Sequence, residues 1–300
     1  MFHKALKMVY FYREMHFLLK MNNKKDYTKI AHIINPVVVE KSSDLFYAQP
    51  ITIKSMFEAR MFSHNGVDVK LFAAVYPEDE ILVNKDFDKI IFLSKSVLDL
   101  KEFNIKRKLP LIKDILEGLY NNSDAEYFIY TNSDIGLQPY FYNYIKELID
   151  LGYDGLCINR KTIPKSVDRI GMLKVENLSL IYTLDGNKHH GIDCFIFKRS
   201  ILKKFNLGDM CIGFPPIGTA LKENIEKYST SFYWEKNANA TFHLGSDRSW
   251  KKPKIFSDYL NHNKQEWQKI DSNIGMTSLI DKLRFEKGFL GKIKILLKNL

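Results

Sequence analysis

The chain of 300 residues carries a formal net charge of +10, and 45% of its residues are hydrophobic. This composition supports a sizeable packed core, excludes a disordered chain, and suits one large α/β domain or two smaller ones. The three cysteines, Cys157, Cys194 and Cys211, stand far apart, which excludes a disulfide framework or a zinc-ligand motif and indicates a reducing compartment.

The N-terminal segment, residues 1–27, is aromatic and apolar but interrupted by charge. Every stretch long enough to cross a bilayer is broken by a charged residue, namely Lys4, Lys7, Arg13, Glu14 or Lys20. The segment also lacks the clean apolar core of a cleavable signal. We expect an extension that packs on the domain as a helix or lies against a surface, and a cytoplasmic protein.

Strand and helix patterns alternate along the first half of the chain. They predict strands at 29–39, 67–76, 89–93, 127–131 and 155–159, and helices at 44–62, 109–120 and 140–151. This alternation is typical of a mainly parallel, doubly wound α/β sheet flanked by helices. The less regular second half predicts strands at 190–197 and 238–244 and short helices at 199–205 and 218–228. We expect a single domain over residues 28–255, followed by a basic tail over 256–300.

The strand at 127–131 ends abruptly in the polar triplet Asn132, Ser133 and Asp134. In an open α/β sheet, ligands bind at the carboxyl ends of the strands. A carboxylate there can hold a divalent cation whose other ligands are phosphate oxygens. An Asx turn, or a cap on the helix that follows, would explain Asn132 and Asp134 equally well.

The order of these elements and the polar triplet resemble nucleotide-sugar glycosyltransferases of the GT-A fold, a Rossmann-like α/β fold. In that family the triplet is Asp-x-Asp, and its last carboxylate binds the metal. The resemblance therefore gives the ligand role to Asp134, while Asn132, which departs from the pattern, would hydrogen-bond the ribose or the sugar.

A second resemblance covers Phe242 to Trp250 and involves the His-x-x-Gly-x-x-Lys-Pro-Trp region of glycogenin-like retaining transferases. It implies that His243 completes a site for Mn²⁺ or Mg²⁺, although a half-buried strand histidine is the plain alternative. Such an ion would stabilise the charge on a leaving nucleoside diphosphate. The donor implied is a UDP- or GDP-linked sugar.

Several residues become candidates for holding the donor. Asn35, Tyr76 and Asp79 lie at the ends of the first two strands, where this fold holds the nucleoside. Asp79 would take a ribose hydroxyl or a base N–H, and Tyr76 would stack on the base. Arg107 and Arg248 would contact the diphosphate. Turn residues and solvated basic loops are the alternatives for these positions.

Two residues are candidates for the reaction itself. Asp193 immediately precedes an apolar strand, where it would be the general base of an inverting transfer or would orient the sugar in a retaining one. Arg160, past the strand at 155–159, stands where sugar or acceptor would approach. A loop cap and a surface salt bridge are the respective alternatives. The histidine region favours retention.

The tail is basic and amphipathic. Its charged residues after Asp281 are Lys282, Arg284, Lys287, Lys292, Lys294 and Lys298 against Glu286. Such a tail suits an anionic membrane surface, or a C-terminal helix that docks on the domain with its basic side solvated. We expect no nucleic-acid partner, because no recognition motif accompanies the charge.

Together these features predict a metal-dependent glycosyltransferase that moves a sugar from a nucleotide donor to a glycan or lipid-linked acceptor in surface polysaccharide assembly. It would be cytoplasmic, or peripheral on the inner face of the membrane. One alternative is a sugar-phosphate nucleotidyltransferase, but those enzymes carry a glycine-rich loop where this chain has Asn35-Pro-Val-Val-Val39. The other is a catalytically silent carbohydrate-binding relative.

Overall fold

The computed structural model describes residues 27–64, 66–164, 166–167, 171–244 and 253–274. The predicted N-terminal extension up to residue 26, the candidate Arg248 and the tail beyond residue 274 lie outside the described residues.

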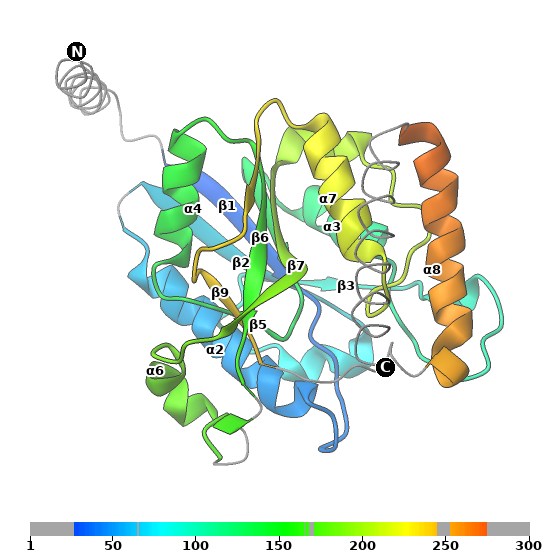
Figure 1. Ribbon diagram of the computed structural model, residues 1–300, viewed down its shortest axis with the longest axis horizontal. Coiled ribbons are helices and arrows are strands. Elements are labelled where there is room, and N and C mark those ends of the chain that lie inside the picture. Colours follow the sequence, from blue (N-terminus) through cyan, green and yellow to red (C-terminus); the bar gives the residue numbers. More distant parts are fainter. Residues whose placement is uncertain (1–26, 65, 165, 168–170, 245–252, 275–300) are drawn as a thin grey trace, which may run out of the picture.

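The described chain forms a mixed sheet with helices on both faces (Figure 1). The strands are β1 (Thr28–Ile34), β2 (Val67–Val75), β3 (Lys89–Phe92), β4 (Tyr127–Thr131), β5 (Ile135–Leu137), β6 (Gly155–Thr162), β7 (Asn187–Lys198), β8 (Phe232–Glu235) and β9 (Thr241–His243). The helices are α2 (Leu45–Phe62), α3 (Ile112–Asn122), α4 (Phe141–Asp150), α6 (Leu178–Ile181), α7 (Ile217–Tyr228) and α8 (Pro253–Ile274). Short 3-10 turns include η1 (Pro77–Leu82), η2 (Val97–Asp99) and η4 (Arg199–Lys204).

The sheet has the strand order β3-β2-β1-β4-β7-β6-β9-β5, and β8 pairs with β6. β1, β2, β3 and β4 run parallel, and β7 runs antiparallel to both β4 and β6. β6 therefore points the same way as β4, with β8 and β9 parallel to it. The predicted class, a mainly parallel α/β sheet flanked by helices in one domain, is confirmed. The carboxyl ends of β1, β2, β4 and β6 meet at one edge, together with the start of β7.

Two hydrophobic clusters cover the two faces of the sheet. The apolar stripe of α3, at Ile112, Ile115, Leu116 and Leu119, packs on one face with residues of α7. α2 and α4 cover the other face, through residues such as Met56 and Ile145. Figure 1 shows α3 and α7 on one side of the sheet, α2 and α4 on the other, and α8 outside α7.

The predicted tail begins within α8, which packs on the domain. The Tyr259 hydroxyl donates to the Ile105 carbonyl at 2.7 Å and accepts from the Arg107 amide at 2.8 Å. Asn263 donates to the carbonyls of Cys211 and Phe214, both at 2.8 Å. These hydrogen bonds hold the segments that lead into α3 and α7 against α8. Among the described residues, no helix has an apolar stretch long enough to span a bilayer.

A buried polar bridge links β1 to β4. His32 is fully buried in β1, with Nε2 2.9 Å from Thr131 Oγ1 and Nδ1 2.8 Å from the Tyr142 hydroxyl. Burial lowers the pKa of His32 to about 3. The imidazole is therefore neutral in the folded protein, and it ties the end of β4 to β1 and α4.

This buried histidine makes folding stability fall with acid. In the unfolded chain His32 binds a proton below pH 6.5, while in the folded protein it stays neutral down to about pH 3. From pH 7.5 to pH 5 we expect the free energy of unfolding, measured with urea, to fall by about 2 kcal/mol through this group alone. His32→Gln should lose that part of the slope, whereas His64→Gln at an exposed position should keep it. An unchanged slope in His32→Gln would contradict the assignment.

Candidate functional site

Five of the predicted residues lie together at the carboxyl edge of the sheet. Asn132 and Asp134 follow β4, Arg160 lies in β6, Asp193 in β7, and His243 ends β9. Hydrogen bonds and ion pairs join them into two connected groups, Asp134 with His243 and Asn132 with Asp193 and Arg160.

The first group is a carboxylate and an imidazole brought together from distant parts of the chain. His243 Nε2 lies 3.0 Å from Asp134 Oδ2. The antiparallel pairing of β5 with β9, in which Ile135 stands opposite His243, sets this distance. The Leu244 amide donates to the Asp134 carbonyl at 3.2 Å and extends the same ladder.

The loop that carries Asp134 is held at both ends. On one side Thr131 contacts His32, and on the other the Leu137 amide donates to Ser55 Oγ of α2 at 2.9 Å. Gly136 lies so close to the Phe242 ring that an added Cβ would stand 2.3 Å from it. The candidate ligand thus rests on a rigid support, as a site that must hold an ion in fixed geometry requires.

Electrostatics keep Asp134 ionised. Burial by itself raises the pKa of Asp134, but the hydrogen bond from His243 and the charges of His243 and Arg160 outweigh it, so the net pKa lies below its usual range. For Asp193 burial dominates and raises the pKa, with Asp134 adding to the effect and Arg160 opposing it. The two carboxylates therefore occupy different environments, which is common where neighbouring acids have different roles.

The first group fits a divalent cation that a substrate helps to bind. Asp134 Oδ1 and His243 Nδ1 are buried without a hydrogen-bond partner among the described residues. The 3.0 Å between Asp134 Oδ2 and His243 Nε2 is the spacing of two adjacent ligands about 2.1 Å from an octahedral ion. Among the residues that the structure describes, no three acidic, histidine or cysteine side chains are grouped so that they could hold a metal ion. Phosphate oxygens of a substrate are further ligands that such a site could use.

The second group centres on Asp193. Its Oδ1 accepts from Asn132 Nδ2 at 2.9 Å, and its Oδ2 accepts from Arg160 Nη1 at 2.6 Å. The side-chain oxygen Oδ1 of Asn132 accepts in turn from the Tyr130 hydroxyl at 3.1 Å. The side chains of Arg160 and Asp193 are 19% and 14% exposed. Because both carboxylate oxygens are engaged, Asp193 holds its neighbours in place.

On the β1 and β2 side of the edge, Asn35 and Asp79 shape the loop after β1. Asn35 Nδ2 donates to the Ala74 carbonyl at 2.6 Å, and Asp79 Oδ1 accepts from the Val38 amide at 2.8 Å. Gln49 bonds both the amide and the carbonyl of Val37, each at 2.8 Å. The loop therefore has a fixed backbone, in which two amide donors are already used.

The other two donor candidates lie differently from the prediction. Tyr76 is 2% exposed, its hydroxyl donates to the Lys95 carbonyl at 2.8 Å, and Lys108 Nζ stands 4.0 Å from its ring centroid. A ring packed in this way has no free face for a base, which conflicts with the stacking role predicted for Tyr76. Arg107 contacts α8, with its guanidinium 4.2 Å from the Phe256 ring centroid, rather than the five clustered residues.

Sequence patterns missed the supports of the site. His32 and Ser55 hold the two ends of the Asp134 loop, yet neither was singled out. A histidine inside an otherwise apolar central strand was the available signal for His32, because a buried imidazole needs partners. Ser55 gives no such signal in a helix interior.

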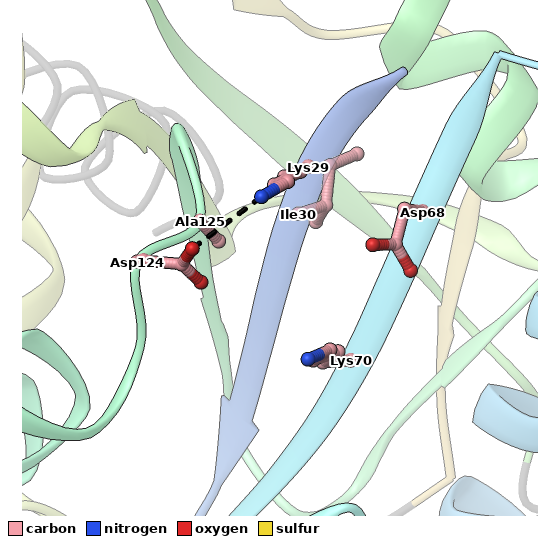
Figure 2. A pocket seen from close by; sticks show the side chains of 6 residues that line it. All are labelled: Lys29, Ile30, Asp68, Lys70, Asp124 and Ala125. Atoms are coloured by element: carbon pink, nitrogen blue, oxygen red, sulfur yellow. Dashed lines mark hydrogen bonds and ion pairs between the residues drawn. The ribbon is translucent and has the colours of Figure 1, made fainter.

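A small pocket lies at the opposite, amino edge of the sheet, and Figure 2 shows its lining. Lys29 and Asp124 form an exposed ion pair across it at 3.4 Å, beside Asp68 and Lys70. Its volume of about 70 Å³ is far below the several hundred Å³ of usual ligand pockets. It is therefore not a candidate for a nucleotide-sugar site.

Comparisons with known proteins give structural matches alone. No protein-family model matches the chain, and no curated protein sequence matches it. Solved structures similar to it include S. aureus TarS 1-349 in complex with UDP-GlcNAc, at 12% identity and a TM-score of 0.44, covering 79% of this chain and 66% of the other. The chain thus spans just under two thirds of that TarS structure.

Two further matches are synthases. One is glucosyl-3-phosphoglycerate synthase from Mycobacterium tuberculosis with Mn²⁺, UDP and glucosyl-3-phosphoglycerate, at 11% identity and a TM-score of 0.43, covering 79% of this chain and 78% of the other. The other is 4-diphosphocytidyl-2C-methyl-D-erythritol synthase from Anaerococcus prevotii, at 9% identity and 0.39, covering 78% and 100%. With TM-scores below 0.5, these matches carry no argument about the chemistry, which rests on the chain's own residues.

The close approach at Gly136 gives a test of the site's support. Gly136→Ala would drive a methyl group into the buried Phe242 ring. We expect it to lower the free energy of unfolding by about 1–3 kcal/mol, measured with urea. Adding Phe242→Leu should recover part of the loss by making room. A Gly136→Ala variant as stable as the parent would contradict this packing.

Proposed function

We propose that the chain is a metal-dependent glycosyltransferase that moves a sugar from a nucleoside diphosphate donor to a glycan or lipid-linked acceptor. The observation that carries the proposal is the convergence of Asp134 Oδ2 and His243 Nε2, 3.0 Å apart at the carboxyl edge, beside a second Asp134 oxygen, Oδ1, that is buried and has no hydrogen-bond partner among the described residues. This edge is where open α/β sheets bind nucleotides. An ionised carboxylate and an imidazole that leave ligand positions open suit Mn²⁺ or Mg²⁺.

Each clustered residue then has a task. Asp134 and His243 hold the cation, which when bound supplies positive charge for the leaving diphosphate. The rigid loop after β1, held by Asn35 and Asp79, receives the nucleoside. Arg160 adds a positive charge beside the reacting sugar, and its buried Nε has no partner among the described residues. Arg248, in the segment after His243, is the proposed cover for the phosphates.

Asp193 is proposed to be a positioning residue in a retaining transfer. A general base must aim a lone pair of its carboxylate at the acceptor hydroxyl, and hydrogen bonds to both oxygens restrict the directions in which the carboxylate can accept. Both oxygens of Asp193 are bonded in this way, to Asn132 and to Arg160. This supports the retaining alternative, in which the leaving phosphate accepts the proton and Asp193 keeps Arg160 and the sugar in place.

The cellular setting that we propose rests on the family resemblance and on the basic tail. We propose a role in surface polysaccharide assembly in the cytoplasm, with the basic tail after residue 281 contacting an anionic membrane surface. That tail lies outside the described residues.

The nucleotidyltransferase alternative conflicts with the loop after β1. Such enzymes bind phosphates with free backbone amides in a glycine-rich loop at this place. Here the amides of Val37 and Val38 already donate to Gln49 and Asp79 side chains. A carbohydrate-binding relative without catalytic activity keeps the cluster but would turn over no donor.

The cation site predicts synergy between metal and nucleotide. Mn²⁺ together with UDP or GDP should raise the melting temperature more than the sum of the two separate shifts, because phosphate oxygens complete a shell that the protein only begins. Asp134→Asn should abolish the excess, and His243→Ala should weaken it. Asp86→Asn, at an exposed position, is the matched control. An Asp134→Asn variant with the parent's synergy would refute the site.

Exchanging the amide and the carboxylate between positions 132 and 193 tests the hydrogen bond that joins them. Asn132→Asp would set a second carboxylate 2.9 Å from Asp193. We expect a loss of about 1–3 kcal/mol in the free energy of unfolding, since like charges replace a hydrogen bond. Combining it with Asp193→Asn restores one amide and one carboxylate, and urea unfolding should recover at least half of the loss. Additive losses in the double variant would contradict the pairing.

A further inference from the structure

Three lysines stand on or just after neighbouring strands of the sheet, and together we term them the basic face: Lys161 in β6, Lys188 in β7 and Lys236 after β8. Lys161 in β6 stands directly opposite Lys188 in β7. Lys188 Nζ donates to Asn237 Oδ1 at 3.0 Å, which sets it beside the chain neighbour of Lys236. Lys188 and Lys236 are exposed, and Lys161 is half-buried.

The pairing of Lys161 with Lys188 is electrostatically unfavourable without an anion. Side chains directly opposite each other in an antiparallel pair share one face, and like charges there are destabilising. Within the described part of the chain, no carboxylate lies within ion-pair distance of any of the three lysines, and the partner of Lys188 is a neutral amide. The exposed Asp185, close in sequence, makes no such pair.

The Trp234 ring contacts Lys236 of the basic face. Its indole Nε1 donates to Asn159 Oδ1 at 2.8 Å, which anchors the ring one residue from Arg160. Lys236 Nζ lies 4.4 Å from the ring centroid and Lys222 Nζ 5.1 Å. Lys222 is neutralised by Glu226, whereas Lys236 is not. The ring therefore holds an uncompensated ammonium near the clustered residues.

The basic face lies on the side of the cluster away from the nucleoside loop. In the sheet, β1 leads into Asn35 and β2 precedes Asp79, whereas β7, β6 and β8 carry or lead into the three lysines. β4 with the triplet lies between the two sides. A donor nucleoside on one side leaves the other for the acceptor.

We propose that the acceptor is an anionic glycan, bearing phosphate or carboxylate groups, that binds the basic face. The assignment of this glycan as acceptor rests on the proposed function, but its binding does not. Lys161, Lys188 and Lys236 pair with its charges, and Arg160 faces the hydroxyl to be modified. Neutral glycans lack the groups that would relieve the repulsion between Lys161 and Lys188.

The test is calorimetric titration with matched oligosaccharides. Phosphopentamannose and pentagalacturonate probe phosphate and carboxylate, with mannopentaose as the neutral counterpart. At least one anionic glycan should bind ten times more tightly than mannopentaose, and its affinity should fall with added salt. The variant Lys161→Gln/Lys188→Gln should weaken that binding about tenfold. Lys203→Gln/Lys204→Gln, the same charge change beyond the other end of β7, should leave it unchanged.

Two outcomes overturn the proposal. One is that neither anionic glycan binds more tightly than mannopentaose. The other is that the two double variants weaken binding equally. The shift in melting temperature with Mn²⁺ and UDP or GDP, measured on the same proteins, reports the donor site separately. A parent without that synergy would refute the glycosyltransferase, whereas the glycan titration would still decide whether the basic face binds anions.

Discussion

The site depends on the pairing of two three-residue strands, β5 and β9. This pairing brings Asp134 to within 3.0 Å of His243, although 109 residues separate them in the chain. Short strands contribute little stability of their own, so the surroundings must hold them. His32 and Ser55 fix the two ends of the Asp134 loop, and the Phe242 ring packs against Gly136. The core of the sheet thus stabilises the geometry of its edge.

Charge balance sets the second constraint. A buried carboxylate is costly unless it is paired. Asp134 is paired with an imidazole, and Asp193 with a guanidinium and an amide. Among the described residues, His243 and Arg160 already pair with Asp134 and Asp193, so a third carboxylate at position 132 would add like charge beside Asp193. Asparagine at this position supplies a hydrogen bond to Asp193 without that added charge.

Sequence patterns predicted the larger elements and the members of the cluster. Apolar strands and amphipathic helices carry a periodic signal, and polar residues at strand ends meet at one edge by topology. β5 was missed because three residues with a central glycine carry no such period. The packing of Tyr76 and the bonds of Asn132 to Asp193 depend on side chains distant in sequence. Local reasoning could not find them, nor the docking of α8 on the aromatic cluster around Phe214 and Tyr259.

The most direct test of the account is the release of free nucleoside diphosphate from a panel of UDP- and GDP-linked sugars, with and without Mn²⁺. We expect metal-dependent release of UDP or GDP by the parent and none by Asp134→Asn. Release of pyrophosphate from a nucleoside triphosphate and a sugar phosphate would indicate the nucleotidyltransferase. Release that is the same with Mn²⁺ or chelator, or undiminished in Asp134→Asn, would contradict the metal-dependent glycosyltransferase.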